Sequence, residues 1–340
     1  MKKIIIFFCG CPIFAPLFLI CSYYSLPLAS PSLQNYYILK DHINQNVPKH
    51  KKRLVIMSAS DGMFGIVGEM IDKETEYYPI NYSVFFGTGL DLEFRINKLI
   101  ASLQNGDTLL LPLNFSFYST QRNPDYFSYY QNMLSWGDKG FLYNHPILTL
   151  KTLLKSPPSQ IPTGFIKHIV AYLRSQDLAN KMEKKWREGG ENFNGINISS
   201  LDRYGELRYH QGTLLKPKTA YSYLNEDFKI SDYFLKNYKK LIDFCMKNNI
   251  KIIVAYPPIL ENPSFDLNKP YFMQIVKNFQ KELLINKIQI QGDPQNFQFP
   301  LQDFYDSPYH LNTQGAIKYT NELIKILKLN SSGLPNPQDS

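Results

Sequence analysis

Short runs of aliphatic residues recur along the chain and are typical of buried β-strands. Residues 53–57, 107–113 and 250–258 are rich in valine, isoleucine and leucine, the pattern of parallel strands that are covered on both faces. Weaker strands are expected at 78–83 and 287–292. Together these runs predict one parallel sheet.

Apolar residues at helical spacing fill the intervals between the expected strands. This spacing predicts helices over residues 64–74, 90–104, 231–249, 270–284 and 313–328. Alternating strands and helices require right-handed crossovers, which place helices on both faces of the sheet. We therefore expect an α/β fold, with three layers (α/β/α) around a central parallel sheet.

The alternation is interrupted between about residues 114 and 225 by a segment rich in aromatic residues and prolines. We expect this segment to be an insertion over the carboxyl edge of the sheet, with a helical piece near 165–187. Its aromatic residues would either line a sugar-stacking groove or pack the insertion onto the sheet. Those between positions 115 and 143 are Phe115, Phe117, Tyr118, Tyr126, Phe127, Tyr129, Tyr130, Trp136, Phe141 and Tyr143.

The most apolar segment is at the N-terminus. Lys2 and Lys3 precede residues 4–24, which carry no charge and would make about 30 Å of helix, enough to span a bilayer core. Residues 1–24 are therefore expected to be a transmembrane signal anchor, with a cleaved signal peptide as the alternative. The flanking lysines favour a cytoplasmic N-terminus, which predicts a single-pass protein of the cell membrane with an extracytoplasmic body.

Three further segments complete the expected organisation. Residues 25–52 are polar with scattered prolines and are interpreted as a juxtamembrane linker. The α/β domain is expected over residues 53–328, so that a chain beginning near Arg53 should be soluble. Residues 329–340 are expected to form a polar tail.

Composition narrows the classes of function. With 44% hydrophobic and 14% aromatic residues, the 340-residue chain can bury a substantial core, which excludes wholesale disorder. The net charge of +8 is scattered apart from a basic run at 49–53, without the patterns of RNA-binding sheets or zinc fingers, so no nucleic-acid partner is expected. A basic protein beside an anionic membrane or envelope polymer is the simpler interpretation.

Cysteine and histidine usage points to chemistry without a metal or another cofactor. Cys245 is the only cysteine outside the apolar N-terminal segment, so no disulfide framework is expected in the body of the protein. The six histidines show no metal-ligand spacing. We expect no metal and no cofactor.

Ligands of open parallel sheets bind beyond the carboxyl ends of the strands, so the residues after each strand are the candidates for chemistry. Small residues surround Ser60 in the segment 58–62, where a tight turn would expose the serine hydroxyl. The alternative is a helix N-cap, a common role of serine and aspartate. Ser83 follows the second strand and Asn114 the third, and each either donates a hydrogen bond to an oxyanion or forms a turn.

A carboxylate and a histidine precede the last helix. Asp306 lies four residues before His310 on the loop that leads into that helix, and Asp303 is a second carboxylate nearby. Histidine is the natural base for a serine, and a neighbouring carboxylate fixes its tautomer and stabilises the imidazolium. An unrelated loop histidine and aspartate are the alternative.

The order of these segments resembles the SGNH/GDSL hydrolase superfamily, especially its membrane-anchored bacterial members, the DltD-type and alginate-acetylation-type envelope proteins. Ser60 matches the nucleophile of the first block, and Ser83 occupies the position of the second-block glycine. Asn114 matches the asparagine of the third block. Asp306 and His310 match the last block.

Besides Ser83 in place of the second-block glycine, two further features depart from the family pattern. Ser58 or Ala59 stands where the family usually has a glycine before the nucleophile. The family usually spaces its aspartate three residues before the histidine. Here Ser307 occupies that position and Asp306 lies one residue earlier.

The resemblance implies a flavodoxin-like SGNH fold and a serine esterase or O-acyltransferase acting on acylated cell-envelope polysaccharide or a small acyl ester, with a membrane acyltransferase as a candidate partner. Ser60 would be the nucleophile, His310 the base and Asp306 its orienting carboxylate. Ser60, Ser83 and Asn114 would form the oxyanion hole. The alternative is a non-catalytic accessory protein that keeps the fold and binds envelope polysaccharide during its assembly or acylation.

Overall fold

The protein is described by a computed structural model over residues 31–85, 92–121, 146–155, 173, 177–189, 198–207, 211–216 and 220–331. Within these residues the chain forms an α/β fold around a five-stranded sheet with the strand order β2-β1-β3-β4-β6, in which every neighbouring pair is parallel. The expected parallel sheet is thus confirmed. Its strands are β1 (Lys52–Ile56), β2 (Tyr77–Asn81), β3 (Thr108–Leu111), β4 (Lys251–Ala255) and β6 (Ile290–Gln291).

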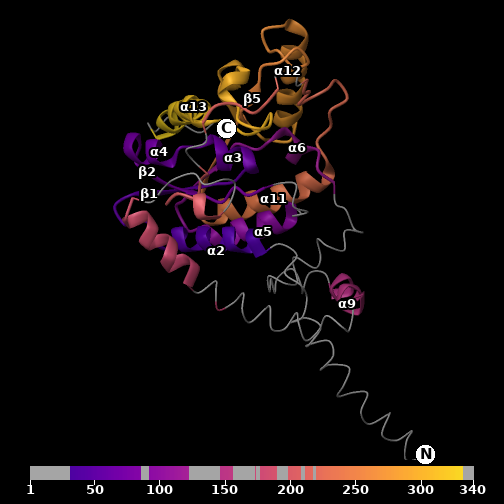
Figure 1. Ribbon diagram of the computed structural model, residues 1–340. Helices are drawn as coiled ribbons and strands as arrows, with labels where there is room; N and C mark the ends of the chain where they lie inside the picture. Colours follow the sequence, from indigo (N-terminus) through magenta and orange to yellow (C-terminus); the bar gives the residue numbers. More distant parts are fainter. Residues whose placement is uncertain are drawn as a thin grey trace, which may run out of the picture.

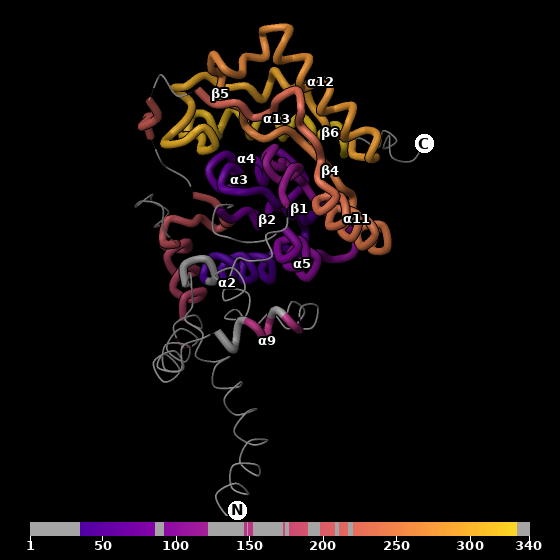
Figure 2. The backbone as a smooth tube through the Cα atoms, turned by 90° about the vertical axis from the view of Figure 1, so that its right-hand side faces the viewer, coloured from indigo at the N-terminus to yellow at the C-terminus, as the bar shows by residue number. Residues whose placement is uncertain are grey.

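Helices cover both faces of the sheet (Figures 1 and 2). On one side lie α2 (Pro31–Gln45), α5 (Leu92–Ser102) and α11 (Asp232–Lys247). On the other side lie α3 (Ser60–Gly65), α4 (Gly68–Glu74) and α13 (Thr313–Ser331).

The remaining elements are short except for one helix. They are α6 (Phe115–Tyr118), α9 (Pro146–Lys155), α12 (Pro270–Ile285), the 3₁₀ helices η3 (Ile198–Ser200), η4 (Pro294–Phe297) and η5 (Leu301–Asp303), and the parallel pair β5 (Ile259–Leu260) and β7 (Gln298–Phe299). The expected helices over 231–249, 270–284 and 313–328 correspond to α11, α12 and α13.

The segment expected as a linker contains a helix of the domain. Helix α2 buries Tyr36, Tyr37, Leu39 and Ile43 in the hydrophobic core. Its Lys40 is completely buried, and Nζ donates to the carbonyl oxygens of Asn81 at 2.5 Å and Gly205 at 2.7 Å. The α/β domain therefore includes α2 and begins before Arg53.

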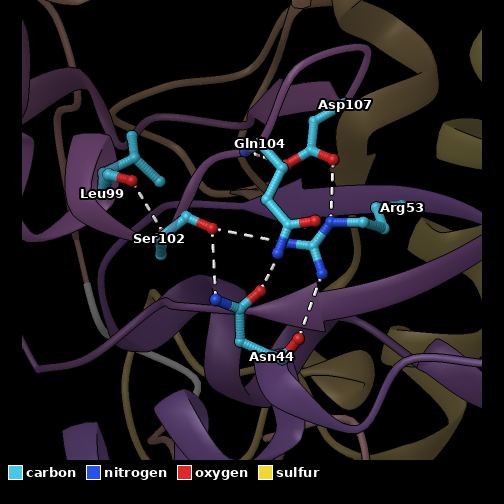
Figure 3. Close-up of polar contacts among 6 residues, drawn as sticks. All are labelled: Asn44, Arg53, Leu99, Ser102, Gln104 and Asp107. Carbon is cyan, nitrogen blue, oxygen red and sulfur yellow. Dashed lines mark hydrogen bonds and ion pairs between the residues drawn. The ribbon is translucent and has the colours of Figure 1, made fainter.

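Arg53 on β1 joins α2 to the start of β3 (Figure 3). Its Nε donates to Asp107 Oδ1 at 2.8 Å, and its two terminal nitrogens donate to the backbone and side-chain oxygens of Asn44 at 3.0 and 2.5 Å. Asn44 Nδ2 in turn donates to the carbonyl of Ser102 at 3.1 Å. The buried carboxylate of Asp107 holds the Arg53 guanidinium in place, and the guanidinium binds Asn44 of α2. These charge-assisted bonds fix α2 at the amino end of the sheet.

The helix expected over 64–74 is interrupted between α3 and α4. The Val67 N–H donates to Thr320 Oγ1 at 2.9 Å, and the Gly68 N–H donates to Glu206 Oε2 at 2.7 Å. A Cβ at position 68 would lie 2.7 Å from Cβ of Tyr204, so glycine is needed for this close approach. Tertiary contacts with α13 and with the segment around Glu206 thus break the helix.

Several sequence-based expectations fall wholly or partly outside the described residues. The expected membrane span at 4–24 and residues 122–143 of the aromatic stretch 115–143 lie outside them. No helix of the described part is long and apolar enough to cross a membrane. Of the helical piece expected near 165–187, residues 177–187 are described and helical. Helix α13 extends to Ser331, into the expected tail.

The described aromatic residues of the insertion belong to the core. Phe115, Phe117 and Tyr118 are buried, and the rings of Phe115 and Tyr118 pack edge-on against Phe279 of α12 with centroids 5.3 and 5.1 Å apart. These three residues therefore pack the insertion onto the core and do not form a sugar-binding surface. The other seven aromatic residues lie outside the described residues.

Candidate functional site

The Ser60 turn follows the carboxyl end of β1. Ser60 is the first residue of α3, and the N-cap position is held by Ala59, with no side-chain hydrogen bond capping the helix. Ser60 is half-buried, and its hydroxyl makes no hydrogen bond to another described residue. The capping alternative does not account for Ser60.

The loop before α13 brings Asp306 and His310 together. Asp306 Oδ1 lies 2.6 Å from Nδ1 of His310. The Tyr305 N–H donates to the His310 carbonyl at 2.7 Å, and Phe304 forms an antiparallel bridge with Leu311. Because the loop closes on itself in this way, a spacing of four residues places the carboxylate beside the imidazole.

The ring of Phe64 connects the histidine to the serine turn. Phe64 and His310 are stacked with centroids 4.0 Å apart and an interplanar angle of 7°. Phe64 lies one helical turn after Ser60 on α3, so His310 packs on the helix that Ser60 begins. The stacking fixes the plane of the imidazole while Asp306 fixes its Nδ1. Helical spacing from Ser60 was the only sequence signal that could have identified Phe64.

Tyr223 also contacts the histidine loop. Its hydroxyl donates to the Pro308 carbonyl at 2.5 Å and accepts from the Leu260 N–H at 2.9 Å. Its ring also packs edge-on with Tyr309, with centroids 6.0 Å apart. Tyr223 lies at the end of the long insertion, and nothing in the sequence connected it to the histidine loop.

Asp303 forms an ion pair with Lys318 of α13. Its side chain is almost completely buried, and both carboxylate oxygens accept hydrogen bonds from Lys318 of α13, at 2.9 and 2.8 Å. Its carbonyl accepts from the Asn312 N–H at 2.8 Å. Between the two carboxylates considered from the sequence, Asp306 is the one that contacts His310.

Ser83 packs against the Ser60 turn from the end of β2. It is fully buried, and its Oγ accepts from the Ser58 N–H at 3.0 Å. A Cβ at position 62 would lie 2.3 Å from this Oγ, so Gly62 makes the contact possible. The Ser83 N–H donates to Asn81 Oδ1 at 2.9 Å and is not directed at a ligand in this conformation.

Asn114 follows β3 and caps the short helix α6. Its Oδ1 accepts from the N–H and the hydroxyl of Ser116 at 3.1 and 3.0 Å. The side-chain oxygen thus has the turn-forming role that was one of the two alternatives, and only the Nδ2 group is suited to donate to an oxyanion. Nearby, the Pro112 carbonyl accepts from the Ser58 hydroxyl at 2.6 Å, which joins the ends of β3 and β1.

Asp61 is the buried charge of the site. Its side chain is 1% exposed, and its Oδ1 accepts from the Ser58 hydroxyl and the Ala59 N–H, each at 2.9 Å. Its Oδ2 is buried and has no hydrogen-bond partner among the described residues. Burial raises the pKa of Asp61 to about 6, while its hydrogen bonds and the charge of His310 lower that pKa by less. In the sequence, Asp61 is one of the polar residues of the segment 58–62, for which helix capping is the expected role of an aspartate.

The described residues contain no cluster of three or more histidine, cysteine, aspartate or glutamate side chains able to hold a metal ion. The arrangement instead offers a hydroxyl, an imidazole and a carboxylate near the carboxyl ends of β1, β2 and β3. No protein-family model matches the sequence, and neither does any curated protein.

Proposed function

We propose that this protein is a serine esterase or O-acyltransferase of the SGNH type. The observation that carries the proposal is the contact of His310 with Asp306, on a ring stacked against the helix that Ser60 begins. A serine hydroxyl and a histidine with one nitrogen on a carboxylate are the nucleophile and the base that nucleophilic acyl transfer requires.

In this proposal each polar group has one role. With Asp306 on Nδ1, the Nε2 of His310 is the nitrogen that accepts the Ser60 proton as the hydroxyl oxygen attacks the acyl carbonyl. The alcohol of the ester leaves with that proton, and an acyl-Ser60 ester remains. Water then regenerates the serine in an esterase, whereas a second hydroxyl takes the acyl group in a transferase.

The proposed oxyanion donors are the Ser60 amide, the Asn114 Nδ2 group and the Ser83 amide. The Ser83 amide could take part only if it left Asn81 Oδ1, to which it donates in this conformation. We therefore expect Ser60 and Asn114 to contribute most.

The strand order supports the finer fold assignment. An order of 2-1-3-4 followed by one further strand, all parallel, is that of flavodoxin-like sheets, whose ligands bind where the order reverses between the first and third strands. The Ser60 turn follows β1 at this point. The substrate class, acylated cell-envelope polysaccharide or a small acyl ester, and the membrane acyltransferase partner come from the family resemblance. The proposed membrane anchor at 1–24 and the extracytoplasmic body come from the uncharged run at 4–24 and the lysines before it.

A non-catalytic accessory protein is the second candidate function. Two observations favour it: the Ser83 amide already has an acceptor, and Asn114 Oδ1 caps α6. Such a protein would keep the fold and bind envelope polysaccharide without turnover.

Labelling with a fluorophosphonate distinguishes the two candidates. The wild-type protein should become covalently labelled, and Ser60→Ala should not. Ser102→Ala is the matched control, because Ser102 is a buried serine of α5 whose hydroxyl donates to the Leu99 carbonyl, and its loss should leave labelling in place. A wild-type protein that is not labelled and hydrolyses none of several acyl esters would favour the accessory role.

A further inference from the structure

We propose that Asp61 is a positioning residue whose buried carboxylate shapes the Ser60 turn and whose negative charge acts on His310 during acyl transfer. This inference rests on the proposed acyl-transfer function. It concerns a residue that the Ser60, His310 and Asp306 mechanism leaves without a role.

The first argument is the geometry of the turn. Asp61 Oδ1 accepts from two groups that precede Ser60, the Ser58 hydroxyl and the Ala59 N–H. These bonds fold the chain back over the start of α3, so that Asp61 points into the protein while the half-buried Ser60 lies at the edge. An aspartate in this position determines the direction in which the preceding serine is presented.

The second argument is the free-energy cost of burying the Asp61 carboxylate. A buried carboxylate with one oxygen lacking a hydrogen-bond partner destabilises the folded state when it is ionised. Such costs are typically retained where a charge is needed for chemistry. In this structure the charge directly follows the candidate nucleophile.

The third argument is the set of groups that face Asp61. From the histidine loop, the charge of the His310 imidazole acts favourably on the Asp61 carboxylate. From the insertion and from α13, Tyr223 and Tyr319 face it. Burial is the main cause of the raised pKa of both tyrosines, and the negative charge of Asp61 adds to it. Among these facing groups only His310 gains a positive charge during acyl transfer.

The Ser58 hydroxyl links the protonation state of Asp61 to the neighbouring strand. It lies within hydrogen-bond distance of both Asp61 Oδ1 and the Pro112 carbonyl, but has a single hydrogen to donate. When Asp61 is protonated, it can donate to Ser58 while Ser58 donates to Pro112. When Asp61 is ionised, Ser58 serves only one of the two acceptors. Ionisation of Asp61 therefore supplies the charge beside His310 but costs a hydrogen bond.

The test compares wild type with Asp61→Asn across pH. Asparagine keeps an oxygen for Ser58 and Ala59 but carries no charge. The rate of fluorophosphonate labelling should be about 10-fold or more lower in the variant at pH 8. The wild-type-to-variant ratio should approach one at pH 5, because wild-type Asp61 is itself largely protonated there. Asp303→Asn, a buried carboxylate bound to Lys318, is the control whose ratio should not change across this range.

A structural role alone would give a ratio that does not vary with pH, and that result would overturn the proposal while leaving the acyl-transfer function intact. A second measurement does not depend on activity. The melting temperature of Asp61→Asn should exceed that of wild type by a few degrees at pH 7.5 but not at pH 4. If wild type and Asp61→Asn had equal melting temperatures at both pH values, the ionised Asp61 carboxylate would not destabilise the folded state as proposed. A wild type that is not labelled would instead overturn the proposed function, and the role of Asp61 with it.

Discussion

At the scale of single residues, the site depends on which of two aspartates reaches the histidine. The two carboxylates lie four and seven residues before His310, and sequence spacing does not separate them. The structure does so through the Tyr305-to-His310 backbone bond, which closes the loop around Asp306. Asp303 falls outside this closed loop and binds Lys318 instead.

This difference predicts opposite phenotypes for two matched substitutions. Asp306→Asn should reduce the rate of fluorophosphonate labelling nearly as much as His310→Ala, by up to ~10⁴-fold as in serine proteases, because the imidazole loses its orienting charge. Asp303→Asn should leave labelling close to normal but lower the unfolding free energy by about 1 kcal/mol, because it weakens the hydrogen bonds to Lys318, a half-exposed lysine that water can solvate. The measurements are labelling rates and urea denaturation. The reverse ranking of the two labelling rates would transfer the orienting role to Asp303.

The residues of the site could be predicted from the sequence better than their partners could. The rule that ligands bind where parallel strands end selects Ser60, Ser83 and Asn114 from positions alone. Phe64 and Tyr223 could not be found in this way, because an aromatic residue that supports a loop has the same sequence pattern as one in the core. The occupied Ser83 amide was also beyond prediction, because it depends on one side-chain rotamer of Asn81.

At the scale of elements, strands were predicted more reliably than α2. Continuous apolar runs such as 250–258 have few alternatives to a buried strand. Helix α2 was not predicted because polar residues flank its short apolar run at 36–39 on both sides. A completely buried lysine, Lys40, also makes the segment look like a solvated linker. The interruption between α3 and α4 was not predicted either. The acceptors of the Val67 and Gly68 N–H groups, Thr320 and Glu206, lie far away in the sequence, so no local pattern indicates them.

Lys40 is the main polar connection between α2 and the site-bearing end of β2. Burial lowers the pKa of Lys40 to about 7, although the nearby carboxylates Glu206 and Asp202 raise it. A base whose pKa is lowered on folding contributes stability that is present above its ordinary pKa and lost as the pH falls through the folded value. The contribution of Lys40 to stability should therefore decline from about pH 10 towards pH 7.

Substitution of Lys40 tests this connection. Lys40→Met should lower the unfolding free energy by about 3 kcal/mol at pH 9, because it leaves the buried carbonyls of Asn81 and Gly205 without their donor. The loss should become smaller at pH 7. Lys52→Met is the control, since Lys52 forms an exposed pair with Glu76 that should contribute less than about 1 kcal/mol. Denaturation curves at the two pH values measure both, and a loss that grows as the pH falls would contradict the assignment.

At the scale of the whole molecule, the sheet gathers segments that are far apart in the sequence. The Ser60 turn, the end of β2, the end of β3 and the histidine loop are joined by contacts of Ser58 with Ser83 and Pro112 and by the stacking of Phe64 on His310. The predicted topology anticipated this convergence, because parallel strands end at the same edge. The position of the domain boundary was not anticipated, since it depends on the burial of α2 against the core.

The boundary and the anchor are tested together by three forms of the chain. The full-length protein should sediment with membranes and resist carbonate extraction, because residues 4–24 are expected to span the bilayer. A chain beginning at Pro31 should be released into solution and unfold cooperatively. A chain beginning at Arg53 was expected from the sequence to be soluble, but it lacks α2 and the Asn44 acceptors of Arg53. Because this truncation exposes core residues that α2 covers, it should aggregate or melt at a markedly lower temperature. Equal melting temperatures for the two truncated chains would show that α2 does not stabilise the domain. Release of the full-length protein by salt alone would mean that basic residues, and not residues 4–24, hold it to the membrane.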